Sequence, residues 1–209
     1  MYINKIMSQN FCKVVLVGES GVGKTSLISQ FIEQEFYELQ TSTTGATFST
    51  KLVNVEKYNT EILLEIWDTA GQERFRSMSK MFYKEAAIAV LVYDITKLQT
   101  FTELNAYWFN AISQSAPEDV ILGVSANKSD LIDYEEVDEN EARDFAKKIG
   151  AVFKPTSAKS SAGINELFTE LGQKYVEYKL KSGRPGSIVV NEGKKKLKNT
   201  GDKKNSCCG

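Results

Sequence analysis

Apolar runs alternate with segments of helical spacing along most of the chain. Short apolar or β-rich runs are predicted to form strands at residues 12–17, 48–55, 61–67, 87–93, 120–124 and 151–153. Apolar positions recur at helical spacing at residues 24–33, 101–116, 138–148 and 164–180. A turn is expected at residues 57–60, between the second and third strands. This alternation predicts an α/β layered fold with a mainly parallel sheet.

The composition is typical of one globular domain. The chain has 209 residues, of which 42% are hydrophobic and 25% charged, and these values exclude a wholly disordered or collagen-like protein. The longest apolar run, residues 86–93, is far shorter than the roughly 20 residues of a membrane-spanning helix. Residues 1–11 lack the apolar core of a secretory signal. The sequence has no histidine, which excludes nucleophile triads, general bases and metal sites that depend on histidine.

The charge is distributed unevenly along the chain. Residues 179–209 carry nine Lys or Arg and two Asp or Glu, a net charge of +7, whereas the rest of the chain carries −8. A basic segment on an acidic body is typical of an interaction arm, and a solvated terminus is the alternative. Apolar residues become sparse after Leu180, so we expect a domain at residues 11–178 and a flexible tail at residues 179–209. The three cysteines, Cys12, Cys207 and Cys208, form no disulfide framework and suit a reducing compartment.

The segment GESGVGKT at residues 18–25 matches the phosphate-binding loop pattern G-x-x-x-x-G-K-S/T. Its glycines allow backbone N–H groups to point at phosphate oxygens, and the helix that follows presents its positive end there. Lys24 would supply a charge to the β- and γ-phosphates, and Thr25 a hydroxyl to Mg²⁺. An ordinary strand-to-helix turn is the alternative, and the motif alone does not separate ATPases, kinases and GTPases. The residues expected to contact the nucleotide here are Gly18, Glu19, Ser20, Gly21, Val22, Gly23, Lys24, Thr25 and Ser26.

A second motif, WDTAGQE, follows at residues 67–73. Asp68 ends an apolar strand, as expected of an aspartate that helps to hold Mg²⁺. Gly71 would let its backbone N–H approach the γ-phosphate. Gln72 can donate and accept a hydrogen bond, which is what orienting a water molecule requires. A plain β-turn is the alternative for this segment.

The third motif, NKSD at residues 127–130, indicates which base is bound. The Asp130 carboxylate can accept hydrogen bonds from both N1–H and the 2-amino group of guanine, whereas adenine lacks that amino group. Asn127 and Lys128 are expected to bind the same nucleotide. The fourth motif, TSAK at residues 156–159, could direct backbone N–H groups at guanine O6, through Ser157, Ala158 and Lys159.

Taken together, GESGVGKT, WDTAGQE, NKSD and TSAK resemble the Ras superfamily of small GTPases. The runs RFRSM at residues 74–78 and LVYDIT at residues 91–96, with the double-cysteine ending, are similar to the Rab family. The resemblance covers residues 11–178 and the end of the chain. It implies a P-loop NTPase (Ras-like) three-layer fold, with a six-stranded, mostly parallel sheet, one antiparallel pair and five flanking helices. It also implies a GTP/GDP switch in membrane traffic.

The resemblance assigns further residues by position. It implies that Thr43 binds Mg²⁺ and the γ-phosphate, and that Phe36 stacks on the guanine. Phe48, Trp67 and Phe82 match an aromatic triad that partner proteins contact, although core packing is an equal alternative for Trp67. Cys207 and Cys208 match a site of geranylgeranyl attachment.

Several positions depart from the family pattern without touching the nucleotide site. Thr44 replaces a usual isoleucine, Phe82 a usual tyrosine, and Lys84 and Glu85 a usual Arg-Gly pair. These departures leave the effector undefined. The context of Ala46, together with Ser20, is similar to the early-endosomal Rab subgroup.

The expected reaction is slow hydrolysis of GTP to GDP and phosphate. Mg²⁺ would be held by Thr25, Thr43 and Asp68, while Lys24 neutralises phosphate charge and Gln72 orients the water. Residues 34–44 contain no Arg or Lys, so an activating protein should supply the missing charge in trans. The other expected partners are effectors, an exchange factor and a prenyl-binding chaperone of the GDI or escort type, and no nucleic acid is expected. The lipidated tail would place the cytoplasmic protein peripherally on the cytosolic face of intracellular membranes, with an endosomal compartment favoured.

Two other classes of function are compatible with the phosphate-binding loop. A nucleoside kinase would need an arginine-rich lid, but no arginine lies between Arg76 and Arg143. A GTP-binding adaptor that does not hydrolyse is disfavoured by Gln72, and a single-turnover assay separates it from a GTPase.

Overall fold

The computed structural model describes residues 10–38, 43, 47–69 and 81–182, and the structural statements below concern these ranges. Six strands form one sheet in the order β2-β3-β1-β4-β5-β6. Strands β2 and β3 pair antiparallel, and every other neighbouring pair is parallel. The strands are β1 (Asn10–Val17), β2 (Thr47–Val55), β3 (Thr60–Asp68), β4 (Ile88–Asp94), β5 (Ile121–Asn127) and β6 (Val152–Thr156).

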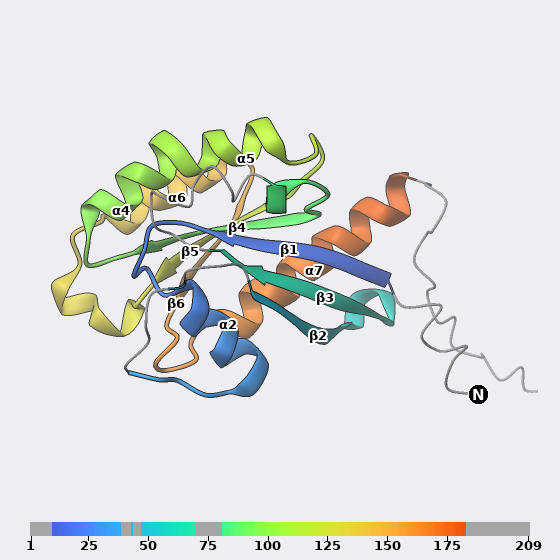
Figure 1. Ribbon diagram of the computed structural model, residues 1–209, viewed down its shortest axis with the longest axis horizontal. Helices are drawn as coiled ribbons and strands as arrows, with labels where there is room; N and C mark the ends of the chain where they lie inside the picture. The colour runs from blue at the N-terminus through green and yellow to red at the C-terminus, as the bar shows by residue number, and fades with distance from the viewer. Residues whose placement is uncertain (1–9, 39–42, 44–46, 70–80, 183–209) are drawn as a thin grey trace, which may run out of the picture.

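Helices cover both faces of the sheet, with α4, α5 and α6 on one side and α2 and α7 on the other (Figure 1). The α-helices are α2 (Lys24–Glu33), α4 (Leu98–Glu103), α5 (Phe109–Ser115), α6 (Glu139–Lys148) and α7 (Ile164–Ser182). With the short helical stretch at residues 81–83, six helices flank the sheet in the described ranges. The number of helices is five when α4 and α5 are counted as one continuous helix, because the π-helix η3 (Leu104–Trp108) joins them without a break.

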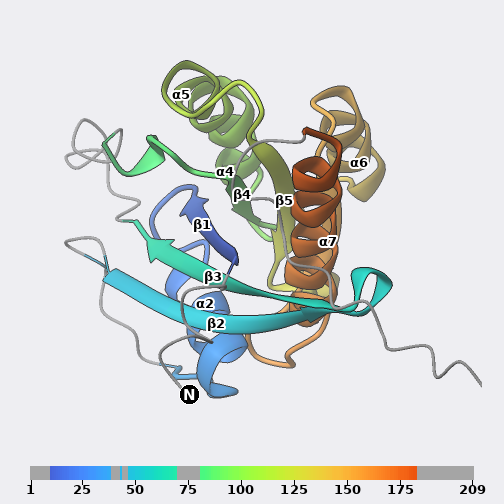
Figure 2. The ribbon, with the colours of Figure 1, turned by 90° about the vertical axis from the view of Figure 1, so that its right-hand side faces the viewer.

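The alternation of side chains along β1 explains the three layers. Cys12, Val14 and Leu16 are buried against α2 and α7, whereas Val15 and Val17 are buried against the helices of the opposite face. Every residue of β4 is buried, as expected of a central parallel strand with helices on both faces. Figure 2 shows the twist of the sheet and α7 running alongside it. The predicted Ras-like α/β fold, with its single antiparallel pair, is confirmed.

Most differences from the predicted elements concern their ends. The first predicted helix has the observed bounds, and the strands predicted to end at residues 124 and 153 continue to Asn127 and Thr156. The predicted turn at residues 57–60 is a 3₁₀ turn, η1 (Glu56–Tyr58), followed by Asn59 in the left-handed conformation. A second 3₁₀ segment, η4 (Ser129–Tyr134), follows β5. Among the described residues, no helix has the length and apolarity needed to cross a membrane.

The unusual residue Glu85 adopts a backbone conformation that favours glycine. Its φ is +62°, in the left-handed region, where a side chain costs about 1–2 kcal/mol. We expect Glu85→Gly to raise the free energy of unfolding by about 0.5–1 kcal/mol, because relief of strain exceeds the entropy that glycine gains in the unfolded chain. Urea unfolding at pH 7 measures the change. As a control, Glu166→Gly within α7 should lower the free energy of unfolding by about 1 kcal/mol. Equal losses in the two variants would contradict the assignment of strain to Glu85.

Candidate functional site

The candidate site lies at the carboxyl ends of the parallel strands, where ligands commonly bind in open α/β sheets. A cavity of about 430 Å³ opens there between loops that are distant in the sequence. The predicted residues that line it are Ser20, Gly21, Gly23, Lys24, Thr25, Ser26, Phe36, Thr43, Asn127, Lys128, Asp130, Ala158 and Lys159. Tyr37, Glu38 and Leu131 also line the cavity and were not predicted from the sequence. The cavity therefore brings together residues from three of the four sequence motifs and from the segment after α2. The remaining motif, WDTAGQE, contributes Asp68, which bonds to the cavity residue Thr25.

Two glycines of the phosphate-binding loop are required by close packing. Gly18 has φ +147°, and a Cβ there would lie 2.2 Å from the carbonyl oxygen of Val92. Gly23 has φ +95°, and a Cβ there would lie 2.4 Å from Asn127 Nδ2. Both approaches are too short for any side chain, so the loop can curl beneath β4 and β5 only with glycine at these positions.

Lys24 carries a buried charge at the start of α2. Its side chain is 6% exposed, and its Nζ donates to the carbonyl oxygens of Gly18 at 2.8 Å and Glu19 at 2.9 Å. Burial lowers the pKa of Lys24 to about 8, although the charges of Asp68 and Glu19 act in the opposite direction. No carboxylate in the described ranges forms an ion pair with it, so the ammonium is available to an anion in the cavity.

Three oxygen-bearing side chains meet beside Lys24. The Thr25 hydroxyl donates to Asp68 Oδ2 at 2.5 Å, and the Oγ1 atoms of Thr25 and Thr43 are 2.9 Å apart. Asp68 is 2% exposed, and burial raises the pKa of its carboxyl group. Its Oδ1 atom is buried and receives no hydrogen bond from the described part of the chain. Hydroxyl and carboxylate oxygens with one atom unsatisfied fit a hard divalent cation such as Mg²⁺.

The third and fourth motifs contact one another directly. Ser157 is fully buried, and its hydroxyl donates to Asp130 Oδ1 at 2.5 Å. This bond orients the carboxylate of Asp130, which lines the cavity. Asn127 joins the same region to the phosphate-binding loop, because its Nδ2 donates to the carbonyl oxygen of Val22 at 2.7 Å.

The buried residue Trp108 contacts the phosphate-binding loop and was not predicted as part of the site. It lies in η3, is fully buried, and its indole N–H donates to Glu19 Oε1 at 2.9 Å. The sequence indicates only an apolar helical position there. The π-helix determines where the indole points, and periodicity contains no signal for it.

Five described residues of the predicted site do not line the cavity itself: the nucleotide contacts Gly18, Glu19, Val22 and Ser157, and the Mg²⁺ ligand Asp68. Val22 is fully buried in the core, and Asp68 and Ser157 contact cavity residues through hydrogen bonds. Gly71, Gln72, Cys207 and Cys208 lie outside the described residues.

The predicted aromatic triad lies together on β2, β3 and the segment before β4. The ring centroids of Phe48 and Trp67 are 5.4 Å apart, and those of Trp67 and Phe82 are 5.5 Å apart. Phe48 is 52% exposed, whereas Trp67 and Phe82 are half-buried and pack against the core. Lys13 Nζ lies 5.3 Å from the Trp67 ring centroid, a cation–π contact. Core packing therefore accounts for part of the environment of Trp67, and its contact with partner proteins stays a prediction.

Comparison with known proteins identifies the family. The family model of the Ras family matches residues 13–177. The Ras-related protein Rab-22A of Homo sapiens is 41% identical over 198 residues, which is 94% of this chain and 97% of that protein. The chain belongs to the Rab family. The Ras-related protein Rab-5A of Dictyostelium discoideum is 39% identical over 94% of both chains. The GTP-binding protein ypt5 of Schizosaccharomyces pombe is 38% identical over 87% of this chain and 84% of that protein.

Rab membership confirms the family and activity predicted from the sequence. The chain is a small GTPase that hydrolyses GTP to GDP and takes part in vesicle traffic. The similarity to Rab-22A and Rab5 proteins confirms the predicted relation to the early-endosomal subgroup. A nucleoside kinase is therefore excluded as the family of this chain.

Proposed function

We propose that the cavity binds GTP, with its phosphates at the Lys24 side and its guanine at the Asp130 side. The observation that carries this proposal is the convergence of both residues on one cavity, from segments more than a hundred positions apart. Lys24 offers an ammonium that bonds only to neutral carbonyl oxygens within the described residues, which suits a polyphosphate. Asp130 offers a carboxylate oriented by Ser157, which suits the paired donors of guanine.

Lys24 and the backbone of the phosphate-binding loop would bind the β- and γ-phosphates. A phosphate oxygen at Nζ would compensate the buried ammonium, because it replaces the neutral carbonyl oxygens of Gly18 and Glu19 with an anion. The start of α2 adds the positive end of a helix dipole at the same place. Phosphate binding would thus be favoured because it compensates the charge of Lys24, which the fold already buries.

Thr25, Thr43 and Asp68 would hold Mg²⁺, which neutralises phosphate charge when it is bound. Thr25 follows Lys24 directly, so one turn of α2 would present both the ammonium and a hydroxyl ligand. Asp68 would act through its unsatisfied Oδ1 atom. Thr43 contacts Thr25 from the segment between α2 and β2, and this contact would let the bound nucleotide control the position of that segment.

The catalytic group we propose is Gln72, with Lys24 and Thr43 stabilising the charge on the phosphates. Gln72 follows β3 by four positions, close in sequence to Asp68, and would orient the attacking water. Residues 34–44 contain no Arg or Lys, so the chain would hydrolyse GTP slowly until an activating protein supplies a positive charge.

We expect Gln72→Leu to leave GTP binding intact and to slow hydrolysis about tenfold or more, because the water loses its orienting group. Single-turnover release of phosphate from GTP, with Mg²⁺ present, measures the rate. Gln99→Leu makes the same chemical change at an exposed position of α4 and should leave the rate unchanged. Hydrolysis by Gln72→Leu at the wild-type rate would remove Gln72 from the mechanism.

The aromatic triad and the loops beside the cavity would form the surface that partners contact. Phe48, Trp67 and Phe82 offer a partly exposed apolar patch on β2, β3 and the segment before β4, as effector binding requires. An exchange factor, a GTPase-activating protein and a prenyl-binding chaperone of the GDI or escort type complete the proposed set of partners. The chain would be cytoplasmic and peripheral on the cytosolic face of intracellular, endosomal membranes.

Lipidation of Cys207 and Cys208 would attach the basic tail at residues 179–209 to the membrane. We expect the double substitution Cys207→Ser, Cys208→Ser to move the protein from the membrane fraction to the soluble fraction of cells. Each buried CH₂ group contributes about 0.8 kcal/mol, and a single chain gives only reversible binding, so either single variant should show an intermediate distribution. Ser206→Ala, next to the pair, is the control and should stay on membranes. Unchanged membrane association of the double variant would contradict the anchor.

A further inference from the structure

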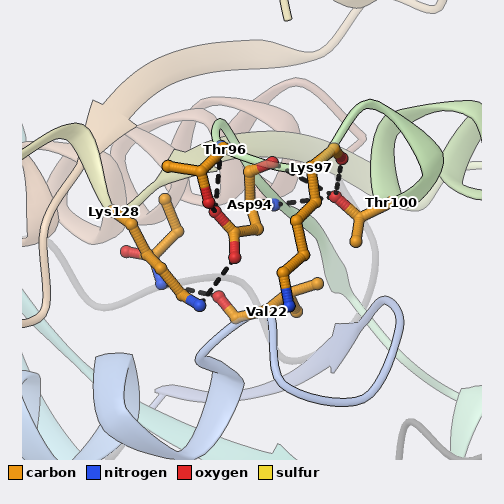
Figure 3. Close-up of polar contacts among 7 residues, drawn as sticks. Val22, Asp94, Thr96, Lys97, Thr100 and Lys128 are labelled. Atoms are coloured by element: carbon orange, nitrogen blue, oxygen red, sulfur yellow. Dashed lines mark hydrogen bonds and ion pairs between the residues drawn. The ribbon is translucent and has the colours of Figure 1, made fainter. Parts of the chain in front are cut away.

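Asp94, at the carboxyl end of β4, is a buried carboxylate with two separate sets of contacts. It is 1% exposed. Its Oδ1 accepts from the Thr96 amide at 3.0 Å and from the Thr96 hydroxyl at 2.7 Å. Its Oδ2 lies 2.6 Å from Lys128 Nζ, and Figure 3 shows these two side chains pointing toward one another. No hydrogen bond from the described residues reaches Oδ2, so the Lys128 ammonium is what compensates its charge.

Lys128 lines the nucleotide cavity in a strained backbone conformation. Its φ is +66°, in the left-handed region that a lysine rarely adopts. Such a conformation persists only where the surrounding structure holds it. Asn127 and Asp130, on either side of this position, also line the cavity. The ion pair with Asp94 fixes the Nζ end of the Lys128 side chain, and the left-handed conformation constrains the Lys128 backbone.

Of the lysines that line the cavity, Lys24 and Lys128 differ in their partners. Lys24 Nζ donates to two neutral carbonyl oxygens, whereas Lys128 Nζ faces a carboxylate. The charge of Lys128 is therefore neutralised within the protein, and its side chain can present its aliphatic stem to a ligand. A neutral wall suits a planar base, and an unpaired ammonium suits a phosphate.

We propose that Asp94 is a positioning residue for nucleotide binding, which holds Lys128 in place at the base side of the cavity and neutralises its ammonium. This inference rests on the proposed nucleotide site. Asp94 does not line the cavity and acts only through Lys128. Without the carboxylate, the Lys128 side chain is free to leave the cavity wall, and bound nucleotide dissociates faster.

The turn after β4 offers the competing explanation, in which Asp94 is only structural. Thr96 contacts Oδ1, whereas the Thr100 hydroxyl bonds to the backbone of Asp94 and to the carbonyl oxygen of Lys97. These bonds do not involve Oδ2. Thr96→Val removes the hydroxyl contact to Oδ1 and leaves the ion pair, so it isolates the structural role.

The test is a double-mutant cycle on the full-length protein, with release of the fluorescent nucleotide N-methylanthraniloyl-GDP as the readout. We expect Asp94→Asn to accelerate release about tenfold or more, as for the loss of a charge-assisted contact. We expect Lys128→Ala to accelerate release at least as much. In the Lys128→Ala background, Asp94→Asn should have no further effect, because its target is absent. Thr96→Val should release nucleotide at the wild-type rate.

The outcomes separate this inference from the proposed site. Acceleration by Asp94→Asn that persists in the Lys128→Ala background, or that Thr96→Val reproduces, shows a structural role and overturns the inference alone. Fast release by Lys128→Ala together with release at the wild-type rate by Asp94→Asn also overturns the inference alone. Normal release by Lys128→Ala overturns both the inference and the placement of Lys128 in the site. If Asp94→Asn does not fold, Asp94→Glu retains the charge but displaces it, and the same cycle applies.

Discussion

The substitution Asp130→Asn is expected to change the preferred base from guanine to xanthine. The Ser157 hydroxyl donates to Asp130 Oδ1, so an asparagine would keep its carbonyl oxygen there and direct its amide nitrogen elsewhere in the cavity. That nitrogen donates, as does the 2-amino group of guanine, and the two would repel one another. Xanthine has an oxygen at the same position and would accept. We expect GDP affinity to fall on the order of 100-fold, because a charge-assisted contact is lost.

Competition of GDP and xanthosine diphosphate against a fluorescent nucleotide measures this change. Asp133→Asn, in the same segment η4, removes an exposed carboxylate that does not line the cavity, and it should keep the wild-type preference for GDP. Full GDP preference in Asp130→Asn would show that another residue recognises the base.

Replacing Lys24 with methionine is expected to abolish tight nucleotide binding and to stabilise the nucleotide-free protein. Lys24 is protonated at pH 7 in both the folded and unfolded chain, and burial lowers its folded pKa from 10.5 to about 8. Because the folded pKa is lower, the cost of the buried charge is fully present below pH 8 and disappears as the pH rises to 10.5. This lowering of the Lys24 pKa corresponds to a cost of about 3 kcal/mol for the buried charge. Methionine removes that cost, and the loss of two hydrogen bonds to carbonyl oxygens offsets part of the gain in stability.

We therefore expect Lys24→Met to raise the free energy of unfolding of the nucleotide-free protein by about 1 kcal/mol or more and to weaken GDP binding at least 100-fold. Urea unfolding and fluorescent-nucleotide titration provide the two measurements. Lys147→Met removes the same charge from an exposed position of α6 and should change neither quantity. A less stable Lys24→Met protein that still binds GDP tightly would contradict the account of Lys24.

The sequence predicted the elements and site residues that depend on one hydrophobic periodicity or on one motif. The helix at residues 24–33 was predicted with its observed bounds because Leu27, Ile28 and Phe31 mark its buried face and Gly23 precedes it. The order of strands and helices followed from unbroken apolar runs such as β4. Lys24, Thr25 and Asp130 were found because each belongs to a motif whose spacing reflects ligand chemistry.

The sequence was uninformative where a structure depends on contacts between distant segments. The π-helix η3 has no periodic signal, so the contact of Trp108 with Glu19 could not be predicted. Asp94 was seen only as part of a resemblance, because its ion pair with Lys128 joins the ends of two neighbouring parallel strands. No local sequence pattern predicts Phe36 or Thr43 as site residues, and only the resemblance assigned them. In the structure both line the cavity together with residues of the motifs.

The most direct test of the central claim is the single-turnover hydrolysis of GTP and of ATP by the full-length protein with Mg²⁺. A GTP-specific site without an arginine in residues 34–44 predicts phosphate release from GTP at a rate on the order of 10⁻⁴–10⁻³ s⁻¹, and none from ATP. Equal hydrolysis of both nucleotides, or no hydrolysis of bound GTP, would contradict it.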